Sequence, residues 1–551
     1  MVIQKKWFKI MTILMVAFTL ILGGCNKKSS KPADTMEPTS STATATDNEA
    51  GAKVDFKGLS FSWYIHYDWA TVDPWGSDQT SKWIQEQKGV TINPISSGGA
   101  AQQKLNTMIV SAELPEVITL DRAADLNKLA KAGQLVPLDE YIDKYPNLKK
   151  WAGEKTLDML RLEDGKLYSF PNWYGGPDTF GNTGWMVNKK IYQDLGSPSL
   201  ATFDDLEAYL MQVKEKYPDI IPFETGHEFA GGEVFYSGFS PGRNHTFSRD
   251  FQAYPENNEL KSIFSDPTYL ESLQFVSKLF RAKLITQDGF TQKKEQYEEK
   301  LKTGKVAVVA NFDILGSAKT GHNALVEKDA TSGYQVIEAP HKTGVDASLV
   351  KSASVATLGW NVSVITKSAK DPEAIFAYMD WATGAEGQQV LQYGPPGLLW
   401  DEVDDQGVPK PNAKFTATTK EELDKLKLGS LNWFANSDWI TLSAQHRSLL
   451  LPKKPNEFDD TGAVAIMKKS SLPINEFQGI TPAPDSEEGI IQVTVKDIYK
   501  EAFAKMVFAD SNEEVATILE KANKDVTKAG FDKVLTYMTT KWQENLKKLA
   551  N

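Results

Sequence analysis

The feature that most constrains the fold is an alternation of strand and helix signals along the chain. Residues 59–65 alternate apolar and small polar side chains, which predicts a strand, and residues 117–120 form a second short strand candidate. Between them, residues 100–112 carry apolar side chains at helical spacing, and a helix over 125–132 ends at Gly133. This order predicts an α/β fold, because such chains build sheets covered by helices.

Capping residues mark further helix starts. Thr202 and Asp205 have the spacing of a capping box, while Asp266 and Asp371 each precede a proline that suits the first helical position. Residues 305–310 are a short apolar run, typical of a strand covered on both faces. The globular part, about 500 residues, exceeds what one core usually supports, so we expect two or three domains.

The N-terminal segment indicates export. Three lysines at positions 5, 6 and 9 precede an apolar run over residues 10–22. This run is shorter than the roughly 20 apolar residues that a membrane-spanning helix needs, and it is followed by small residues. We therefore expect residues 1–24 to be a lipoprotein signal peptide. Residues 22–25 resemble the bacterial lipobox, in which the cysteine thiol takes a diacylglycerol group, so Cys25 is the expected lipidation site.

Cys25 is also the only cysteine, which excludes a disulfide within the chain. Residues 25–54, rich in Ser, Thr, Ala and Pro, contain almost nothing that a core would bury, so we expect a flexible tether. The expected location is the extracytoplasmic face of the cell membrane, held by the lipid. The net charge of −11 and the lack of a basic run after the signal segment argue against nucleic acid as a partner.

Signals for catalysis are weak. Residues 238–242 match the G-x-S-x-G string of serine hydrolases, but Pro241 has no N–H to donate to an oxyanion. The six histidines are scattered, and the acidic run over 401–405 has Val403 where a calcium loop needs an oxygen ligand. We expect no catalytic residue, no metal site and no cofactor.

Aromatic side chains interleaved with polar ones stand out in four segments: 63–69, 171–176, 359–361 and 432–434. The C–H face of a sugar ring packs on an aromatic plane, while its hydroxyls need donors and acceptors nearby. A single tryptophan of this kind can equally belong to a core. Four clusters in one chain favour carbohydrate binding.

Several segments carry a family resemblance in their order and spacing. They are residues 114–118, 131–139, 164–171, 185–188 and 304–307, followed by Gly359-Trp360 and a helix that starts at Pro372. With the lipobox and tether, they resemble the solute-binding lipoproteins of carbohydrate ABC importers, solute-binding protein family 1. The resemblance covers nearly the whole chain.

The resemblance implies a two-lobed clamp of the type II periplasmic-binding-protein class, with mixed sheets flanked by helices and an oligosaccharide held between the lobes. It places lobe 1 at residues 55–172 plus 333–400 and lobe 2 at 180–332 plus 401–551, with crossings near 171–176, Gly333 and Gly397. It also implies importer permease subunits as partners, and we expect a monomer. The calcium loop of some relatives is not carried over, because residues 217–221 lack its pattern.

The candidates for ligand contact are aromatic and polar side chains at expected strand ends, crossings and loops. They are Trp63, Tyr64, Tyr67, Trp69, Asp121, Asn172, Trp173, Trp185, Phe239, Arg243, Asn311, Trp360, Asn361 and Trp433. Trp360 ranks first, because Gly359 before it permits a close approach and Asn361 after it offers a donor and an acceptor.

Two other functions stay open at this point. The chain could be a tethered enzyme that degrades extracellular polysaccharide, because linear sequence does not exclude two carboxylates that face each other across a cleft. It could also be a receptor for peptides or other small solutes on the same clamp.

Overall fold

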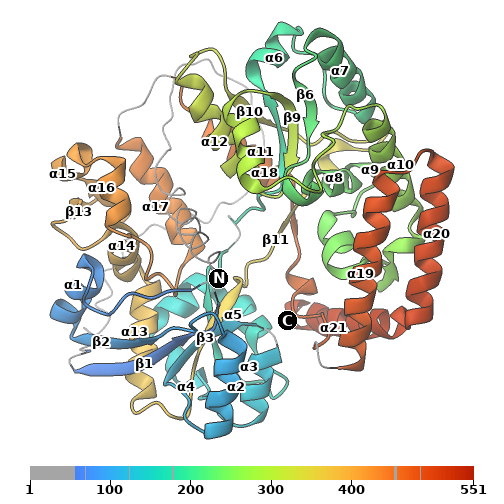
Figure 1. The fold of residues 1–551 in the computed structure, drawn as a ribbon. Helices are drawn as coiled ribbons and strands as arrows, with labels where there is room; N and C mark the ends of the chain where they lie inside the picture. Colours follow the sequence, from blue (N-terminus) through green and yellow to red (C-terminus); the bar gives the residue numbers. More distant parts are fainter. Residues whose placement is uncertain are drawn as a thin grey trace, which may run out of the picture. The chain divides into compact units, whose positions relative to one another are not determined.

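The computed structural model describes residues 56, 58–68, 70–122, 124–176, 179–451, 456–483 and 486–550. Trp69, Cys25 and the expected signal peptide and tether lie outside the described residues. The chain divides into two compact units, whose elements are labelled in Figure 1. Unit 1 runs to Gly176 and resumes over Leu358–Lys453, and unit 2 comprises Pro177–Thr357 and Lys454–Asn551.

Unit 1 is built on a 5-stranded sheet in the order β2-β1-β3-β12-β4. The strands are β1 (Leu59–Ile65), β2 (Val90–Ile95), β3 (Val117–Asp121), β4 (Ser169–Asn172) and β12 (Asn361–Ile365). β1 pairs in parallel with β2 and β3, whereas β12 runs antiparallel between β3 and β4. β1, β3 and β4 therefore end at the edge of the sheet where β12 begins.

Helices cover this sheet, and a small hairpin of β13 (Trp400–Val403) and β14 (Pro409–Pro411) completes unit 1. The helices are α1 (Gln79–Lys88), α2 (Ala101–Ser111), α3 (Ala124–Lys131), α4 (Asp139–Ile142), α5 (Pro146–Leu160), α13 (Pro372–Thr383), α14 (Ala385–Tyr393), α15 (Ala413–Ala417), α16 (Lys420–Lys425) and α17 (Ser437–Leu449). α13 contacts β1, β12 and α5, and its Ile375, Phe376 and Met379 are fully buried in the core.

Unit 2 has a 4-stranded sheet in the order β10-β5-β9-β6. The strands are β5 (Gly184–Asn188), β6 (Ile221–Glu224), β9 (Val306–Asn311) and β10 (Tyr334–Ile337). β6 and β9 are parallel, while β5 is antiparallel to both β9 and β10. Two further pairs are β7 (Ala253–Glu256) with β8 (Glu259–Ser262) and β11 (Ala353–Val355) with β15 (Ser471–Pro473).

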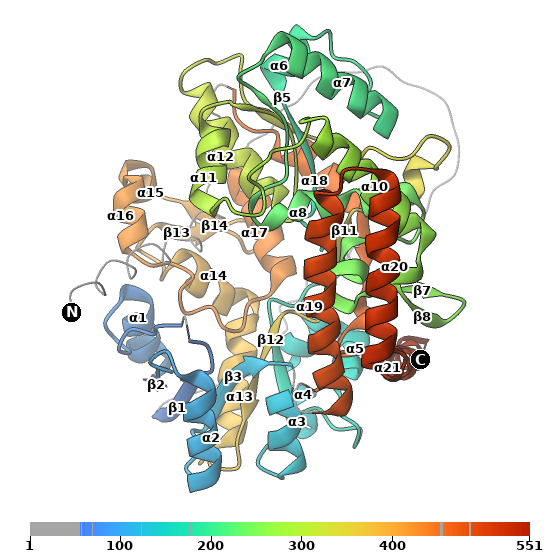
Figure 2. The same cartoon turned by 45° about the vertical axis from the view of Figure 1, so that its right-hand side comes forward.

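The helices of unit 2 include a long C-terminal set, in which α19 and α20 lie side by side in both Figure 1 and Figure 2. They are α6 (Lys189–Asp194), α7 (Phe203–Lys216), α8 (Ala230–Val234), α9 (Tyr236–Phe239), α10 (Pro267–Arg281), α11 (Lys294–Lys302), α12 (Ile314–Val326), α18 (Asp460–Lys469), α19 (Glu487–Val507), α20 (Asn512–Ala529) and α21 (Phe531–Ala550). Shorter turns are the 3-10 helices η2 (His227–Phe229), η4 (Ile263–Ser265), η5 (Ala347–Leu349) and η6 (Asn475–Phe477) and the π-helix η3 (Phe247–Phe251).

The predicted α/β class and the predicted helix starts are confirmed. Thr202 and Asp205 form the capping box at the start of α7, and Asp266 and Asp371 cap the proline-initiated helices α10 and α13. The apolar run over 305–310 is β9, with every residue of the strand buried. Its neighbours are one parallel and one antiparallel strand, so the sheet is mixed.

Two elements near the N-terminus escaped sequence analysis. The prediction placed one helix between β1 and β3, whereas the structure has α1, β2 and α2 there. α1 has polar residues at most positions and buries mainly Ile84, which leaves little apolar periodicity to read. β2 contains Pro94, a residue that demotes a run to an edge strand, and β2 is indeed at the edge of the sheet.

The predicted boundaries at Gly333 and Gly397 are wrong. Residues 333–357 belong to unit 2, because β10 pairs with β5. Residues 401–453 belong to unit 1, where Trp439 of α17 packs against Tyr393 of α14 at a ring distance of 6.1 Å. These pairings are long-range, so local glycine signals do not reveal them.

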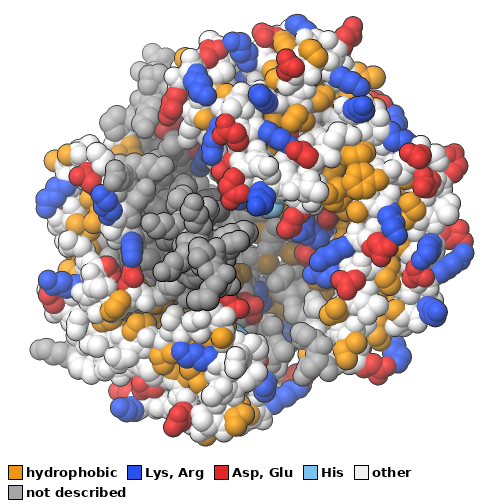
Figure 3. All heavy atoms as spheres, in the orientation of Figure 1, with side chains coloured by type: hydrophobic (Ala, Val, Ile, Leu, Met, Phe, Trp, Pro, Cys, Tyr) orange, Lys and Arg blue, Asp and Glu red, His pale blue; other side chains and the backbone are white. Residues whose placement is uncertain are grey.

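The helices and one face of the surface were compared with what a membrane or a polyanion would require. None of the helices in the described ranges combines the length and apolar character that crossing a membrane requires. On the face shown in Figure 3, acidic and basic side chains are intermixed rather than gathered by sign. The described side chains on that face form no continuous basic area of the kind that a polyanion would bind.

One buried histidine in unit 2 makes the stability of the fold depend on pH. His245 is only 7% exposed, and its ring stacks on Phe312 with centroids 4.6 Å apart and planes at 21°. Burial, together with the nearby charge of Arg249, lowers the pKa of His245 to about 3. The imidazole is therefore neutral in the folded protein at any pH near neutrality.

We expect acid to destabilise the protein through His245. The unfolded chain binds a proton here below its ordinary pKa of about 6.5, whereas the folded chain does not until about pH 3, so stability falls as pH falls between these values. Lowering the pH from 7 to 5 should remove about 2 kcal/mol, and His245→Gln should abolish that part of the loss. Denaturant unfolding of both proteins at the two pH values measures it. Equal losses in wild type and variant would contradict the prediction.

Candidate functional site

The candidate site lies at the edge of the unit 1 sheet where three strands end and one begins. β3 ends at Asp121, β4 ends at Asn172, and β12 begins at Asn361, which is the register partner of both. β1 ends at Ile65, and Tyr67 follows two residues later. In open α/β sheets, ligands bind at the carboxyl ends of the strands, so this edge is the position that the fold favours for a ligand.

Three aromatic side chains, which we call the aromatic group, meet at this edge: Tyr67, Trp360 and Trp433. The ring centroid of Tyr67 lies 5.2 Å from that of Trp360, and it stacks on Trp433 at 6.3 Å with planes at 12°. Trp360 is 43% exposed, although large apolar side chains are usually buried. An exposed aromatic surface is thus held in place by rings that are themselves packed.

Charged side chains lie beside the aromatic group. The Tyr67 hydroxyl donates a 2.7 Å hydrogen bond to Oδ1 of Asp121, and burial together with this carboxylate raises the pKa of Tyr67 far above its ordinary value. Arg122 donates from its guanidinium to the carbonyl oxygen of Gly359. Burial lowers the pKa of Arg122 to about 10, against the attraction of Asp121, so the guanidinium is charged at neutral pH. The edge thus combines donors, acceptors and flat rings.

A buried amide connects the elements that carry these side chains. Asn172 is fully buried, and its side-chain nitrogen donates to Oδ1 of Asn361 at 2.9 Å. Its side-chain oxygen accepts from the backbone N–H of Ala435 at 2.7 Å. Asn172 therefore fixes the start of β12 and the segment that holds Trp433 relative to the end of β4. It is a positioning residue, because it has no exposed surface for a ligand.

The backbone around the aromatic group takes unusual conformations. Trp173 has φ +56°, a conformation that a bulky side chain rarely adopts, and its N–H donates to the carbonyl oxygen of Ala435 at 2.8 Å. Gly359 has φ +72°, and a Cβ added there would lie 2.0 Å from the carbonyl oxygen of Asn172. Only glycine fits between β4 and Trp360.

The structure thus brings together half of the candidates for ligand contact: Tyr67, Asp121, Asn172, Trp173, Trp360, Asn361 and Trp433. Trp63 and Tyr64 belong to the core beneath them. The indole N–H of Trp63 donates to Thr119 at 2.8 Å, and the Tyr64 hydroxyl donates to the carbonyl oxygen of Ala101 at 2.9 Å. Trp69 lies outside the described residues.

The other four candidates are in unit 2 and are held by their own contacts. Trp185 and Phe239 pack inside the core, against Phe235 and Phe203 respectively, so core packing accounts for both side chains without a ligand. Arg243 pairs with Asp266 at 2.8 Å and lies over the ring of Tyr254. Asn311 is buried at the end of β9, where its side-chain oxygen accepts from the N–H of Phe312.

Sequence analysis missed Arg122, whose guanidinium supports the turn before Trp360. The available signal was its position directly after Asp121 at the end of a predicted strand. A search for surface depressions does not point to the site either. Two shallow ones lie elsewhere, beside α2 around Lys104 and beside α11 around Lys300.

Comparison with known proteins identifies the fold that carries this edge. The profile of the family described as bacterial extracellular solute-binding protein matches residues 74–389, which is more than half of the chain. The chain belongs to this family. The predicted recognition as a solute-binding protein is therefore confirmed.

Curated relatives of this solute-binding protein are transporter components. A segment of 249 residues is 28% identical to the fructooligosaccharide ABC transporter substrate-binding protein FusA of Streptococcus pneumoniae serotype 4, covering 42% of this chain and 45% of that protein. A carbohydrate ABC transporter substrate-binding protein of the same organism is 21% identical over 256 residues, covering 45% of this chain and 48% of that protein. The match thus spans less than half the length of either relative.

Solved structures share the fold of this solute-binding protein over most of its length. The alginate-binding protein AlgQ2 superposes with a TM-score of 0.64 at 18% identity, covering 88% of this chain and 98% of that chain. An HMO-binding, ABC-transporter-associated protein from Bifidobacterium longum infantis gives 0.65 at 16% identity, with the same two coverages. FusA from S. pneumoniae in complex with fructo-nystose gives 0.63 at 18%, covering 88% and 99%. The two-lobed solute-binding fold is confirmed.

We expect Gly359→Ala to destabilise unit 1 well beyond the usual penalty of a side chain at positive φ. That penalty is about 1–2 kcal/mol, and here the added Cβ also displaces the backbone of Asn172, so a total above about 3 kcal/mol should result. Gly133→Ala is the matched control, because Gly133 has φ +68° and open space around its Cβ position. Denaturant unfolding compares the two variants. Equal losses would show that the close approach to Asn172 carries no cost.

Proposed function

We propose that this solute-binding protein is the substrate-binding component of an ABC importer and that it captures an oligosaccharide. It does so without catalysing a reaction, and the candidate site at the unit 1 sheet edge supplies ligand contacts. Importer permease subunits receive the loaded protein. The aromatic group beside Asp121 and Arg122 is the observation that carries the proposal.

The chemistry of a sugar fits this edge. A pyranose or furanose ring presents C–H groups that pack on a flat aromatic face, and the exposed ring of Trp360 supplies that face. Sugar hydroxyls donate and accept, and the carboxylate of Asp121 accepts while the guanidinium of Arg122 donates. The exposed ring is rigid, because Tyr67 packs beside it and Tyr67 is itself stacked on Trp433. A rigid platform loses little entropy when a ligand binds.

Relatives support the carbohydrate class. The curated relatives carry names that refer to fructooligosaccharide and carbohydrate transport, and the similar structures bear titles with alginate, HMO and fructo-nystose. All these names describe binding proteins. They support a glycan as the ligand of this chain and favour binding over catalysis.

We further propose that Cys25 carries a diacylglycerol group and holds the protein on the extracytoplasmic face of the membrane. The support is the apolar run over 10–22 followed by two glycines and the only cysteine of the chain. Residues 26–54 then act as a tether between the lipid and unit 1.

Titration calorimetry tests the ligand class. The purified protein is titrated with fructo-, gluco-, galacto- and manno-oligosaccharides and with a panel of short peptides. We expect saturable 1:1 binding to at least one oligosaccharide and none to the peptides. Binding to peptides alone would overturn the proposal. Chromatography of the same mixtures after hours should show intact sugar, and turnover at catalytic protein concentration would identify an enzyme instead.

Trp360→Ala should weaken oligosaccharide binding by about 1–3 kcal/mol and leave the unfolding midpoint nearly unchanged, because the ring is exposed and stacks on ligand. Trp185→Ala is the matched control: it empties a site that is 1% exposed and should cost about 3–5 kcal/mol of stability. Calorimetry gives the first quantity and thermal unfolding the second. A Trp360→Ala protein that binds normally but melts early would assign Trp360 to the core.

Cys25→Ala should yield protein that is neither lipidated nor processed, because the modified thiol is missing. Mass spectrometry of the membrane-associated wild type should show a mature N-terminus at Cys25 with the mass of a diacylglycerol group. A wild-type N-terminus without lipid would refute the anchor. Replacing Ser29 instead, which lies in the tether, should leave modification intact.

A further inference from the structure

Unit 2 contains a buried carboxyl group that the candidate site does not use. Glu233 of α8 is only 8% exposed. Its Oε1 lies 3.7 Å from Nη1 of Arg249, which is longer than a hydrogen bond, and its Oε2 makes no hydrogen bond to the described residues. A carboxylate in a protein interior is unfavourable unless it is both paired and hydrogen-bonded. The geometry therefore favours a Glu233 side chain that carries a proton.

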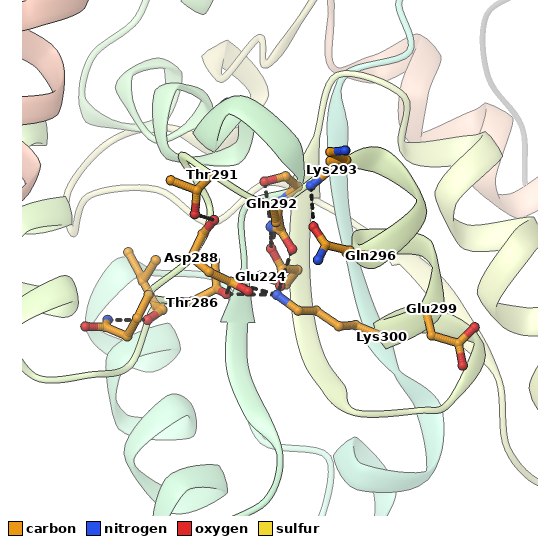
Figure 4. A network of polar contacts seen from close by, with 12 residues as sticks. Glu224, Thr286, Asp288, Thr291, Gln292, Lys293, Gln296, Glu299 and Lys300 are labelled. Carbon is orange, nitrogen blue, oxygen red and sulfur yellow. Dashed lines mark hydrogen bonds and ion pairs between the residues drawn. The ribbon is translucent and has the colours of Figure 1, made fainter. Parts of the chain in front are cut away.

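A second buried carboxyl group of unit 2, that of Glu224 at the end of β6, has a full set of partners, as Figure 4 shows. Its Oε1 accepts from the N–H of Gly226 at 3.1 Å and from Gln292 at 2.6 Å, and its Oε2 accepts from Lys300 at 3.1 Å. These contacts hold the loop that leads from β6 to η2. Glu233, nine residues further along the chain, has no comparable set of partners.

Two elements beside Glu233 have strained or rare backbone conformations. In η2, Glu228 and Phe229 both have φ +57°, a region that such side chains rarely adopt. Arg249 lies in the π-helix η3, and its Nη2 is 3.3 Å from the largely exposed carboxylate of Glu228. Strained elements at a surface open at a lower free energy than a regular core does. η2 and η3 are thus suited to local opening.

Titratable and charged groups from four elements act on Glu233. They are Glu228 of η2, Arg249 and Asp250 of η3, Tyr269 of α10 and Tyr499 of α19. Burial raises the pKa of Glu233 to about 7, while Arg249 and the nearby Tyr499 hydroxyl lower it and the acidic neighbours raise it. The strand β9, on which α8 packs, has no titratable side chain, and Tyr236 of α9 donates to Asp266 instead.

We propose that Glu233 is a proton-dependent lock on η3. With its proton, the neutral carboxyl group tolerates burial, and α8, η2 and η3 stay closed around it. Without its proton, the carboxylate has only the distant guanidinium of Arg249 to offset the loss of water. η3 then opens locally, so that water reaches the charge. This device goes beyond the proposed function and does not depend on which solute the protein binds.

Proton binding fixes the direction of the response. The closed form keeps the proton of Glu233 up to about pH 7, whereas a form in which water reaches the carboxyl group has the ordinary pKa of about 4.5. The closed form therefore binds more protons between these values, and it loses stability relative to the open form as the pH rises through 7. The effect of His245 has the opposite direction, because burial lowers the pKa of that side chain.

Hydrogen exchange of the purified full chain, measured by mass spectrometry at pH 6 and pH 8, tests the lock. Exchange rates are corrected for the intrinsic effect of pH. In peptides that cover residues 247–251, the wild-type protection factor should fall about tenfold from pH 6 to pH 8, because the pKa of Glu233 is about 7 in the closed form and 4.5 in the open form. Glu233→Gln, which has the same shape and no charge, should keep its protection at both pH values.

Glu228→Gln is the matched control, because it removes the exposed carboxylate that contacts the same arginine. It should show the same fall in protection as the wild type. Peptides from α20 serve as a reference for global unfolding and should show no such fall. If Glu233→Gln does not fold, Glu233→Met takes its place, because its unbranched side chain has neither a charge nor an unpaired oxygen.

Each outcome either supports or overturns the lock. A fall in the wild type and in Glu228→Gln, confined to η2 and η3 and absent without the Glu233 carboxyl group, supports it. Constant protection in the wild type would overturn it, and so would an equal fall in the Glu233 variant or an equal fall in α20. The measurement needs no ligand, so its failure leaves the proposed function standing, and a failure of the proposed function leaves the lock standing.

Discussion

The pairing of β12 between β3 and β4 is the constraint on which unit 1 depends. The chain leaves unit 1 at Gly176, builds most of unit 2, and returns at Leu358 to place β12 in the middle of an already started sheet. The register is fixed by Asn361, which pairs with Asp121 on one side and Asn172 on the other. Both faces of β12 are buried, so a shift by one residue would put Asn361 and Ser363 where Val362 and Val364 pack and would break the hydrogen bond between Asn172 and Asn361.

That register also creates the candidate site. Trp360 precedes β12 directly, so its position at the sheet edge follows from the pairing of the strand. Asn172 also fixes the segment that carries Trp433, because its buried amide binds both Asn361 and the backbone of Ala435, near Trp433. A buried amide without its partners costs roughly 1–3 kcal/mol, which makes the arrangement specific as well as stable. Trp360 and Trp433 are thus positioned by the polar contacts of Asn172, which is fully buried.

The strand-end edges of the two units have similar residues, although their sheets differ in order and strand number. Each edge has an aromatic ring immediately next to a buried asparagine: Trp360 before Asn361 in unit 1 and Phe312 after Asn311 in unit 2. Each also has an arginine accompanied by carboxylates, Arg122 with Asp121 and Arg249 with Glu228 and Glu233. The two rings differ in access: Trp360 is 43% exposed, whereas His245 stacks on Phe312 at 4.6 Å and Arg249 lies over the same ring at 4.8 Å.

The sequence by itself determined the class of the fold, the capped helices and the buried strand β9, because these depend on contacts within a few residues and on periodicity. It also indicated Trp360, Asn361 and Tyr67, since glycine and polar residues beside aromatic ones are a local signal. Only the tertiary structure decided that Trp63, Tyr64, Trp185 and Phe239 lie in cores, that residues 401–453 join unit 1, and that Arg122, Arg249 and Phe312 meet other segments. The physical reason is that residues tens to hundreds of positions away determine how exposed a ring is and which group pairs with a charge. The residues adjacent in sequence do not contain this information.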